Sequence, residues 1–186
     1  MKSPVKIFAP ATISNVGPGF DLMGFALEQP GDIMIVKPND KGILRIINNS
    51  GSDIPVDPDK NVASISVYAL LETLCCKTGF DLIFETKINP GSGIGSSAAS
   101  CAAAVVGVNE LLNRPFSQKE LMLFAMKGEF VASGSVHADN VAPALLGGFI
   151  LIRDYNPIDI IQIDAPDKLI CTVAHPDIQI KTLESR

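Results

Sequence analysis

The sequence predicts an α+β domain, and three observations favour this class. The chain has 186 residues, of which 47% are apolar and 19% charged, enough for one substantial core, or for one domain and a fragment of another. Short β-branched runs bounded by turn residues are interspersed with longer apolar runs of helical length. The resulting order, β-β-β-α-β-α-α-β-β-β, lacks the strict alternation of a doubly wound sheet, and no linker divides it.

The first half of the chain is predicted to hold four strands and one helix. Residues 9–21 contain too much Gly, Pro and Asn for a regular element. Capping residues at 57–61 precede a helix from about Val62 to Lys77, which Gly79 stops. The expected strands are Val5–Phe8, Ile33–Val36, Ile43–Ile47 and Asp81–Thr86.

The second half is predicted to hold two helices followed by three strands. The run Ala98–Asn113 is apolar on nearly every side, which is typical of a centrally buried helix. Ser117 and Glu120 form a capping-box sequence before a helix over about Gln118–Val131. The expected strands are Gly148–Ile152, Ile158–Ile163 and Leu169–Val173.

Charge and cysteine content exclude several classes of protein. A net charge of −5 without a Lys/Arg cluster argues against nucleic-acid binding, although local basic groups could hold one small anion. No apolar run approaches the roughly 20 residues of a membrane span, and residues 1–10 lack the apolar core and cleavage site that would predict a signal peptide. With two histidines and no CxxC pair, zinc is not predicted. Buried free thiols in a reducing cytoplasm are expected instead, at Cys75, Cys76, Cys101 and Cys171.

The most informative segment is the glycine–serine loop of residues 89–100. Glycines at 91, 93 and 95 let the backbone turn tightly and approach a ligand without obstruction by a Cβ atom. Ser96 and Ser97 stand where the buried helix begins, so its free N–H groups and positive end face the loop. This combination predicts a phosphate site, where a serine hydroxyl could also reach a bound Mg²⁺.

Three other interpretations of this loop follow from its composition and spacing. A flexible loop with ordinary serine caps has the same composition. A Walker loop needs a lysine before its serine or threonine, and none is present. The dinucleotide fingerprint fits Gly93, Gly95 and Ala98, but it expects an acidic residue at the end of a second strand, where this chain has the break 113–117.

Together with two further segments, the loop resembles the GHMP small-molecule kinases. The first segment is Pro10–Asp21, followed by Gly24 and Ala26-Leu27. The other is Glu129 with Gly134–Ala144, closing in Gly147-Gly148, and its run Asn140–Ala144 points to the branch that acts on homoserine. The resemblance covers essentially the whole chain.

The resemblance implies a mostly antiparallel sheet packed on helices, with a left-handed βαβ unit. It implies that residues 1–186 form the N-terminal, ATP-binding domain, with the start of a C-terminal domain at about 176–186 and the rest of that domain missing. The implied activity is ATP-dependent phosphorylation of the side-chain hydroxyl of L-homoserine to O-phospho-L-homoserine, with Mg²⁺, on the route to threonine. A fragment of this kind is expected to be inactive alone.

The resemblance also assigns roles to individual residues. Ser97 and Glu129 would hold Mg²⁺, and Asp139 would act on the substrate hydroxyl either as a base or by orienting it. The residues implied for the amino-acid substrate are Asn15, Asp21, His137, Asp139 and Arg186. The residues implied for the nucleotide are Asn61, Val62, Lys87, Asn89, Pro90, Gly91, Ser92, Gly93, Ile94, Gly95, Ser96, Ser97, Ala98 and Ala99.

Alternatives stay open at this point. Without the resemblance, these residues have ordinary structural interpretations, such as turn residues, helix caps, a core residue, or a Glu129 that pairs with Lys127. A sibling kinase acting on mevalonate or a sugar, or a non-catalytic nucleotide-binding module, has the same loop. A homodimer is compatible with the sequence.

Overall fold

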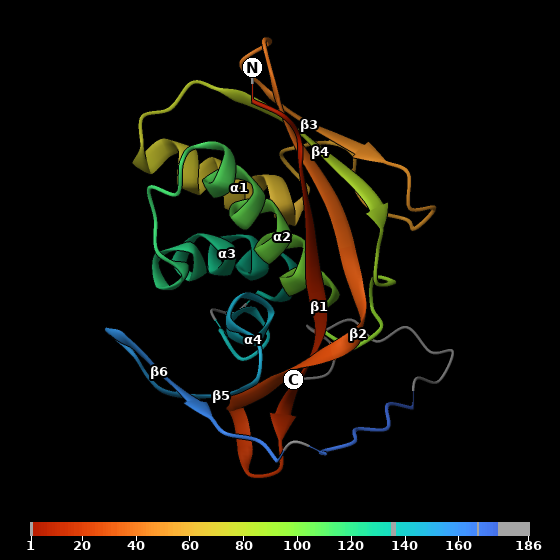
Figure 1. The fold of residues 1–186 in the computed structure, drawn as a ribbon, viewed down its shortest axis with the longest axis vertical. Helices are drawn as coiled ribbons and strands as arrows, with labels where there is room; N and C mark the ends of the chain where they lie inside the picture. The colour runs from red at the N-terminus through yellow and green to blue at the C-terminus, as the bar shows by residue number, and fades with distance from the viewer. Residues whose placement is uncertain (1, 135–136, 167, 175–186) are drawn as a thin grey trace.

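The computed structural model describes residues 2–134, 137–166 and 168–174. A six-stranded sheet forms one layer, and in Figure 1 the helices lie together on one side of its two longest strands. The strands are β1 (Val5–Val16), β2 (Gly19–Asn39), β3 (Leu44–Asn48), β4 (Gly79–Thr86), β5 (Phe149–Tyr155) and β6 (Ile158–Ile163). The helices are α1 (Val62–Thr73), α2 (Ser96–Leu111), α3 (Gln118–Ser133) and α4 (Val141–Leu146). None of the described helices is long and apolar enough to cross a membrane.

The 21-residue strand β2 organises the sheet. Its residues 33–39 pair with β4, and its residues 23–25 pair with β5. Along most of its length it also pairs with β1, antiparallel. Because β2 is shared in this way, the N-terminal strands lie beside both the β4 end and the β5 end of the sheet.

The sheet is mostly antiparallel, as the resemblance implies. The exception is β3 and β4, which run parallel and are joined by α1, so they form a βαβ unit. The handedness of this unit stays a prediction. The order along the sheet is β3-β4-β2-β5-β6, with β1 paired to β2.

Helix α2 is the centre of the core, as its uniform apolar character predicts. It packs against α1, α3, β1 and β2, and 13 of its 16 residues are buried. Small side chains allow this close packing. A Cβ atom on Gly107 of α2 would lie 2.4 Å from a methyl group of Val36 in β2, so the helix sits on the sheet at a distance that only glycine permits.

The caps predicted at two helix starts are confirmed. The Ser117 hydroxyl accepts a hydrogen bond from the Glu120 amide, and the Glu120 carboxylate accepts one from the Ser117 amide at 2.8 Å. At α1, the Asn61 side-chain oxygen accepts from the Ala63 amide at 3.0 Å. Both helices begin where the sequence predicts.

The prediction that residues 9–21 are irregular was wrong. Strand β1 continues to Val16, and β2 begins at Gly19, so the segment is the tip of a β-hairpin. The irregular composition reflects the turn and two left-handed residues, Asn15 and Asp21, each with φ of 59°. Pairing with β2 overrode the weak strand propensity of these residues.

One helix end, one missed helix and one predicted strand also differ from the structure. Helix α1 ends at Thr73 instead of Lys77, because Leu74 caps it and Cys75 adopts φ of 50°. Helix α4 was missed, because Pro143 and the surrounding loop-like residues concealed a six-residue helix. Residues 169–173, predicted as a strand, form no strand, and their exposed apolar side chains lack a neighbouring strand among the described residues.

The cysteine prediction is confirmed in part. All four cysteines are free, but only Cys101 is buried. Cys75 and Cys171 are exposed, because α1 ends early and 169–173 does not join the sheet. An apolar sequence neighbourhood therefore did not predict burial at these two positions.

Candidate functional site: the loop before α2 and the neighbouring acidic cluster

The loop before α2 depends on three glycines with left-handed backbone. Gly91, Gly93 and Gly95 have φ of 76°, 73° and 68°, and α2 begins directly after them. A Cβ atom on Gly95 would lie 1.9 Å from the Thr12 hydroxyl oxygen. Glycine is therefore required at residue 95 for its φ and for space, so the loop passes close to β1 directly before the first turn of α2, which has no side-chain cap.

A buried ion pair supports this loop from below. The Lys87 ammonium lies 3.3 Å from an Asp32 carboxylate oxygen, with side-chain exposures of 4% and 0%. Lys87 donates to the carbonyl oxygens of Ile88 at 3.0 Å and Ser96 at 2.8 Å, and also to the Ser96 hydroxyl. These partners flank the loop, so one ammonium group joins its start to its end.

Asp32 completes the support. Its carboxylate accepts from the Ile88 amide at 2.8 Å and from the Ser100 hydroxyl in the first turns of α2 at 2.7 Å. Burial raises the pKa of Asp32 and lowers the pKa of Lys87, and the attraction between the two groups opposes both shifts. The pair is therefore tied to both ends of the loop, and its charges compensate each other in a desolvated position.

Helix α3 places Glu129 beside the first turn of α2. Burial raises the pKa of this carboxyl to about 7, against the opposing effects of a Ser97 hydrogen bond and the Lys87 charge, while the nearby Asp139 raises it further. The Oε2 atom of Glu129 is buried without a hydrogen-bond partner among the described residues. An unsatisfied buried carboxylate oxygen next to Ser97 is suited to a cation.

The start of α4 is joined to β1 and to the loop by side-chain hydrogen bonds. The Thr12 hydroxyl donates to the Asn140 side-chain oxygen at 2.8 Å, and the Asn140 amide donates to the Ser14 hydroxyl at 3.0 Å. The Thr12 amide also donates to the Ile94 carbonyl at 3.1 Å. The loop before α2 and the segment before α4 are thus held on the same strand.

An acidic cluster lies at this junction. The His137 Nδ1 atom is 3.6 Å from an Asp21 carboxylate oxygen. Asp139 is only 3% exposed, and burial raises its pKa, while a Ser14 hydrogen bond and the His137 ring oppose the shift. Asn15 accepts from the Asp21 amide at 2.8 Å. The structure therefore brings Asn15, Asp21, His137 and Asp139 together, as the sequence resemblance implies.

Other predicted residues have structural roles or cannot be placed. Asn61 uses its side chain to cap α1 and to donate to the Pro55 carbonyl at 2.7 Å. The Val62 carbonyl faces the Cys101 thiol of α2 at 3.6 Å, so the start of α1 lies beside α2. Asn89 accepts a hydrogen bond from Ser52 at 3.3 Å. Arg186 lies outside the described residues.

Sequence reasoning missed Asp32 and Tyr155. The signal for Asp32 was a single acidic residue at the start of a run that is otherwise apolar, which is costly unless the carboxylate is partnered. Tyr155 offered no comparable signal. Its hydroxyl donates to the Asp21 carbonyl at 2.9 Å and accepts from the Ala138 amide at 3.2 Å, contacts that only the tertiary structure creates.

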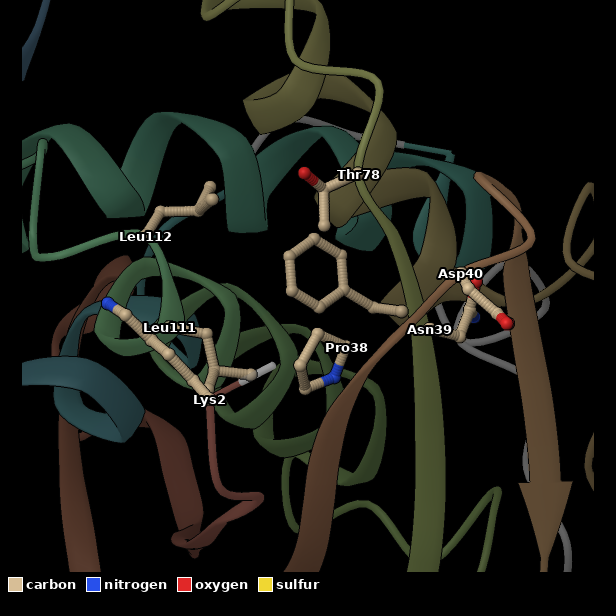
Figure 2. A pocket seen from close by; sticks show the side chains of 8 residues that line it. Lys2, Pro38, Asn39, Asp40, Thr78, Leu111 and Leu112 are labelled. Carbon is tan, nitrogen blue, oxygen red and sulfur yellow. The ribbon is translucent and has the colours of Figure 1, made fainter.

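Two surface hollows lie away from this site. One, of about 320 Å³, is at the C-terminal end of α2, where Leu111 and Leu112 face Pro38 and Thr78 across the hollow (Figure 2). The loop is at the opposite end of this helix, about 24 Å away for 16 residues. The second hollow, of about 440 Å³, lies at the end of α1 and includes Tyr68. Neither includes a residue of the glycine loop.

A glycine-rich loop before a buried helix, a carboxylate beside the first turn of that helix and an acidic cluster alongside form one continuous region of the structure. Residues 61–148 match the family described as GHMP kinases N terminal domain, and the chain belongs to this family. A homoserine kinase of Chlorobium phaeobacteroides is 47% identical to the chain over 191 residues, which cover 96% of this chain and 60% of that relative.

Solved structures give the same result for the fold. A crystal structure of homoserine kinase from Cytophaga hutchinsonii matches with a TM-score of 0.83 at 47% identity, covering 89% of this chain and 53% of that one. The Methanococcus jannaschii mevalonate kinase matches with a TM-score of 0.69 at 15% identity, covering 88% and 56%, and so shares the fold alone. The chain spans about 60% of the length of the curated relatives that it matches.

Proposed function

We propose that this protein transfers the γ-phosphoryl group of ATP to the side-chain hydroxyl of L-homoserine. The observation that carries the proposal is the placement of an acidic cluster, centred on Asp21, His137 and Asp139, beside the bare N-terminus of α2. The 47% identity to proteins named homoserine kinase supports homoserine over mevalonate or a sugar as acceptor. Matches of this extent to kinases also favour an enzyme over a non-catalytic nucleotide-binding module.

The triphosphate binds at the loop of residues 89–95 and the first turn of α2. Free amides and the positive end of a helix attract phosphate oxygens without a loop lysine. Lys87 acts from below: its ammonium group is buried in the pair with Asp32, and it holds the two ends of the loop together. Asn61 and Val62, at the start of α1, border the adenine.

Mg²⁺ fits the Ser97–Glu129 corner. The buried Glu129 oxygen without a partner and the adjacent Ser97 provide two oxygen ligands, and Mg²⁺ commonly takes few protein ligands and completes its shell with phosphates and water. Among the described residues, no group of three or more His, Cys, Asp or Glu side chains is placed to hold a metal ion. When bound, Mg²⁺ neutralises the β- and γ-phosphate charge.

The amino-acid end of the substrate binds at the acidic cluster. The Asp21 carboxylate pairs with the substrate ammonium, while Asn15 and His137 offer polar contacts. Arg186, outside the described residues, is suited to the substrate carboxylate. The substrate hydroxyl oxygen attacks the γ-phosphorus, the bond to ADP breaks, and the hydroxyl proton is released, giving O-phospho-L-homoserine, ADP and H⁺.

Asp139 orients the hydroxyl. An alcohol is far less acidic than any carboxyl group, so even the raised pKa of Asp139 leaves it a weak base for the ground-state hydroxyl. Positioning the oxygen for in-line attack is the larger contribution in phosphoryl transfer.

The free cysteines, one of them fully buried, suit a reducing compartment, so we place the enzyme in the cytoplasm. We also propose that the protein forms a homodimer, which size-exclusion chromatography with light scattering tests.

The function is tested by measuring ADP release from ATP·Mg²⁺ by the full-length protein, including the C-terminal domain that the resemblance implies, with homoserine, mevalonate or galactose. We expect release with homoserine alone. Ser97→Ala and Glu129→Gln should both reduce turnover and raise the Mg²⁺ concentration required, while Ser117→Ala, which alters only the cap of α3, should not. Equal release with all three acceptors, or with none, contradicts the assignment.

A further inference from the structure

Tyr155, the last residue of β5, contacts the two segments that form the amino-acid end of the site. We infer that Tyr155 is a positioning residue that sets the distance between the hairpin tip at Asp21 and the segment of residues 137–139, and so determines affinity for the amino-alcohol substrate. The inference rests on the proposed function, because it assigns the cluster to that substrate.

One hydroxyl group bridges the two segments. The Tyr155 hydroxyl donates to the Asp21 carbonyl at 2.9 Å and accepts from the Ala138 amide at 3.2 Å. Ala138 is fully buried, so its amide would lack a comparable partner without this oxygen. The bridge therefore holds residues that lie 117 positions apart in the sequence.

The same residue also contacts His137. The two rings meet edge to face, with their centroids 6.3 Å apart and an interplanar angle of 88°. This contact orients the imidazole, whose Nδ1 atom lies 3.6 Å from the Asp21 carboxylate. Tyr155 thus sets both the backbone of Asp21 and the ring that faces its side chain.

Asp21 needs such support because its backbone is left-handed. A φ of 59° is unfavourable for aspartate by about 1 kcal/mol, so neighbouring groups must hold it. Its amide donates to the Asn15 side chain at 2.8 Å, and its carbonyl accepts from Tyr155. With both sides of the residue held, the direction of its carboxylate is determined before the substrate arrives.

A role in packing alone is the alternative. The Tyr155 ring packs against the hydrophobic core, and a phenylalanine would fill the same space. The two interpretations differ only in the hydroxyl group, so Tyr155→Phe separates them. The chain offers a matched control, because its other tyrosine, Tyr68, lies on α1 beside the second hollow and away from the cluster.

The experiment compares Tyr155→Phe and Tyr68→Phe with the unmodified protein, all in the full-length form. It measures KM for homoserine, KM for ATP, kcat, the melting temperature, and hydrogen exchange of the peptide containing Ala138. For Tyr155→Phe we expect KM for homoserine to rise roughly three- to tenfold, the amount one lost hydrogen bond explains, and Ala138 to exchange faster. KM for ATP should stay within about twofold. Tyr68→Phe should change neither KM value, nor the hydrogen exchange at Ala138.

Two results would overturn the inference. One is an unchanged KM for homoserine together with unchanged exchange at Ala138. The other is an equal rise in both KM values with a lower melting temperature, which is what a purely structural role produces. If the unmodified protein does not phosphorylate homoserine, the proposed function fails, and the exchange measurement still decides whether Tyr155 holds the two segments together.

Discussion

Lys87 and Asp32 form an ion pair 3.3 Å apart, almost completely removed from solvent, beneath a loop that has no lysine of its own. In a Walker loop, a lysine of the loop itself contacts the phosphates. Here the Lys87 ammonium lies behind the loop backbone. It holds the loop ends at Ile88 and Ser96. The geometry of the loop is therefore coupled to the stability of this pair.

Breaking the pair should destabilise the fold strongly. In Lys87→Met, the Asp32 carboxylate stays buried without its counter-charge, so we expect the free energy of unfolding to fall by about 3–5 kcal/mol. Lys6→Met is the matched control, because Lys6 pairs with Glu85 at 2.8 Å on the surface and should contribute less than about 1 kcal/mol. Urea denaturation measures both. Similar small losses in the two variants would show that the buried pair is not required.

Alanine substitutions at Gly95 and Gly93 distinguish the effect of backbone strain from the effect of a steric clash. Both have left-handed φ, so alanine at either position should cost about 1 kcal/mol of stability. A Cβ atom has open space at residue 93, but at residue 95 it meets Thr12. We therefore expect Gly95→Ala to raise KM for ATP by about tenfold or more and Gly93→Ala to affect it much less. Equal KM values in the two variants would contradict the steric argument.

Because the Glu129 carboxyl is buried, we expect the free energy of unfolding of the metal-free protein to depend on pH. Its pKa is about 7 when folded and near 4.5 when unfolded, so between these values the folded state binds more protons and stability falls as the pH rises. Glu129→Gln removes this effect. Its stability relative to the unmodified chain should increase by roughly 3 kcal/mol from pH 4.5 to pH 8.

Thermal or urea unfolding in EDTA at several pH values measures this difference. The exposed Glu72 on α1 supplies the control variant, Glu72→Gln, which should show no such trend. A constant difference between Glu129→Gln and the unmodified chain across the range would rule out the buried, protonated state.

A substitution at Asp139 distinguishes two roles for this carboxylate, which are orienting the substrate hydroxyl and removing its proton. If it orients the hydroxyl, Asp139→Asn should keep part of its hydrogen bonding and lower kcat by roughly 10- to 100-fold, without removing the acid limb of the pH–rate profile. Steady-state kinetics of the full-length protein across the pH range gives both quantities. Loss of the acid limb in this variant would instead identify Asp139 as the base.

Much of the helical framework and the loop could be predicted from the sequence because those signals are local. The capping box at Ser117, the alanine-rich α2 and the spacing of Gly91, Gly93 and Gly95 depend on neighbours in the chain. The fold class followed from the order of such elements. The residues of the acidic cluster were predicted only from the family resemblance, because Asn15 and Asp21 by themselves are ordinary turn residues.

Features that depend on long-range pairing escaped prediction. The strand character of residues 9–21 comes from pairing with β2, and the exposure of Cys171 follows from the absence of strand pairing at 169–173. Local propensity is weak at both places, so tertiary partners decide the outcome.

By itself, the sequence determined that a glycine-rich loop stands before a buried helix, because glycine spacing and helix initiation are properties of adjacent residues. Only the tertiary structure decided that Asp32 joins Lys87 beneath that site and that Tyr155 joins Asp21 to Ala138. The physical reason is distance along the chain. The partner of a buried charge or hydroxyl is brought close by strand pairing in the sheet. It lies far away in the sequence, so no local pattern predicts it.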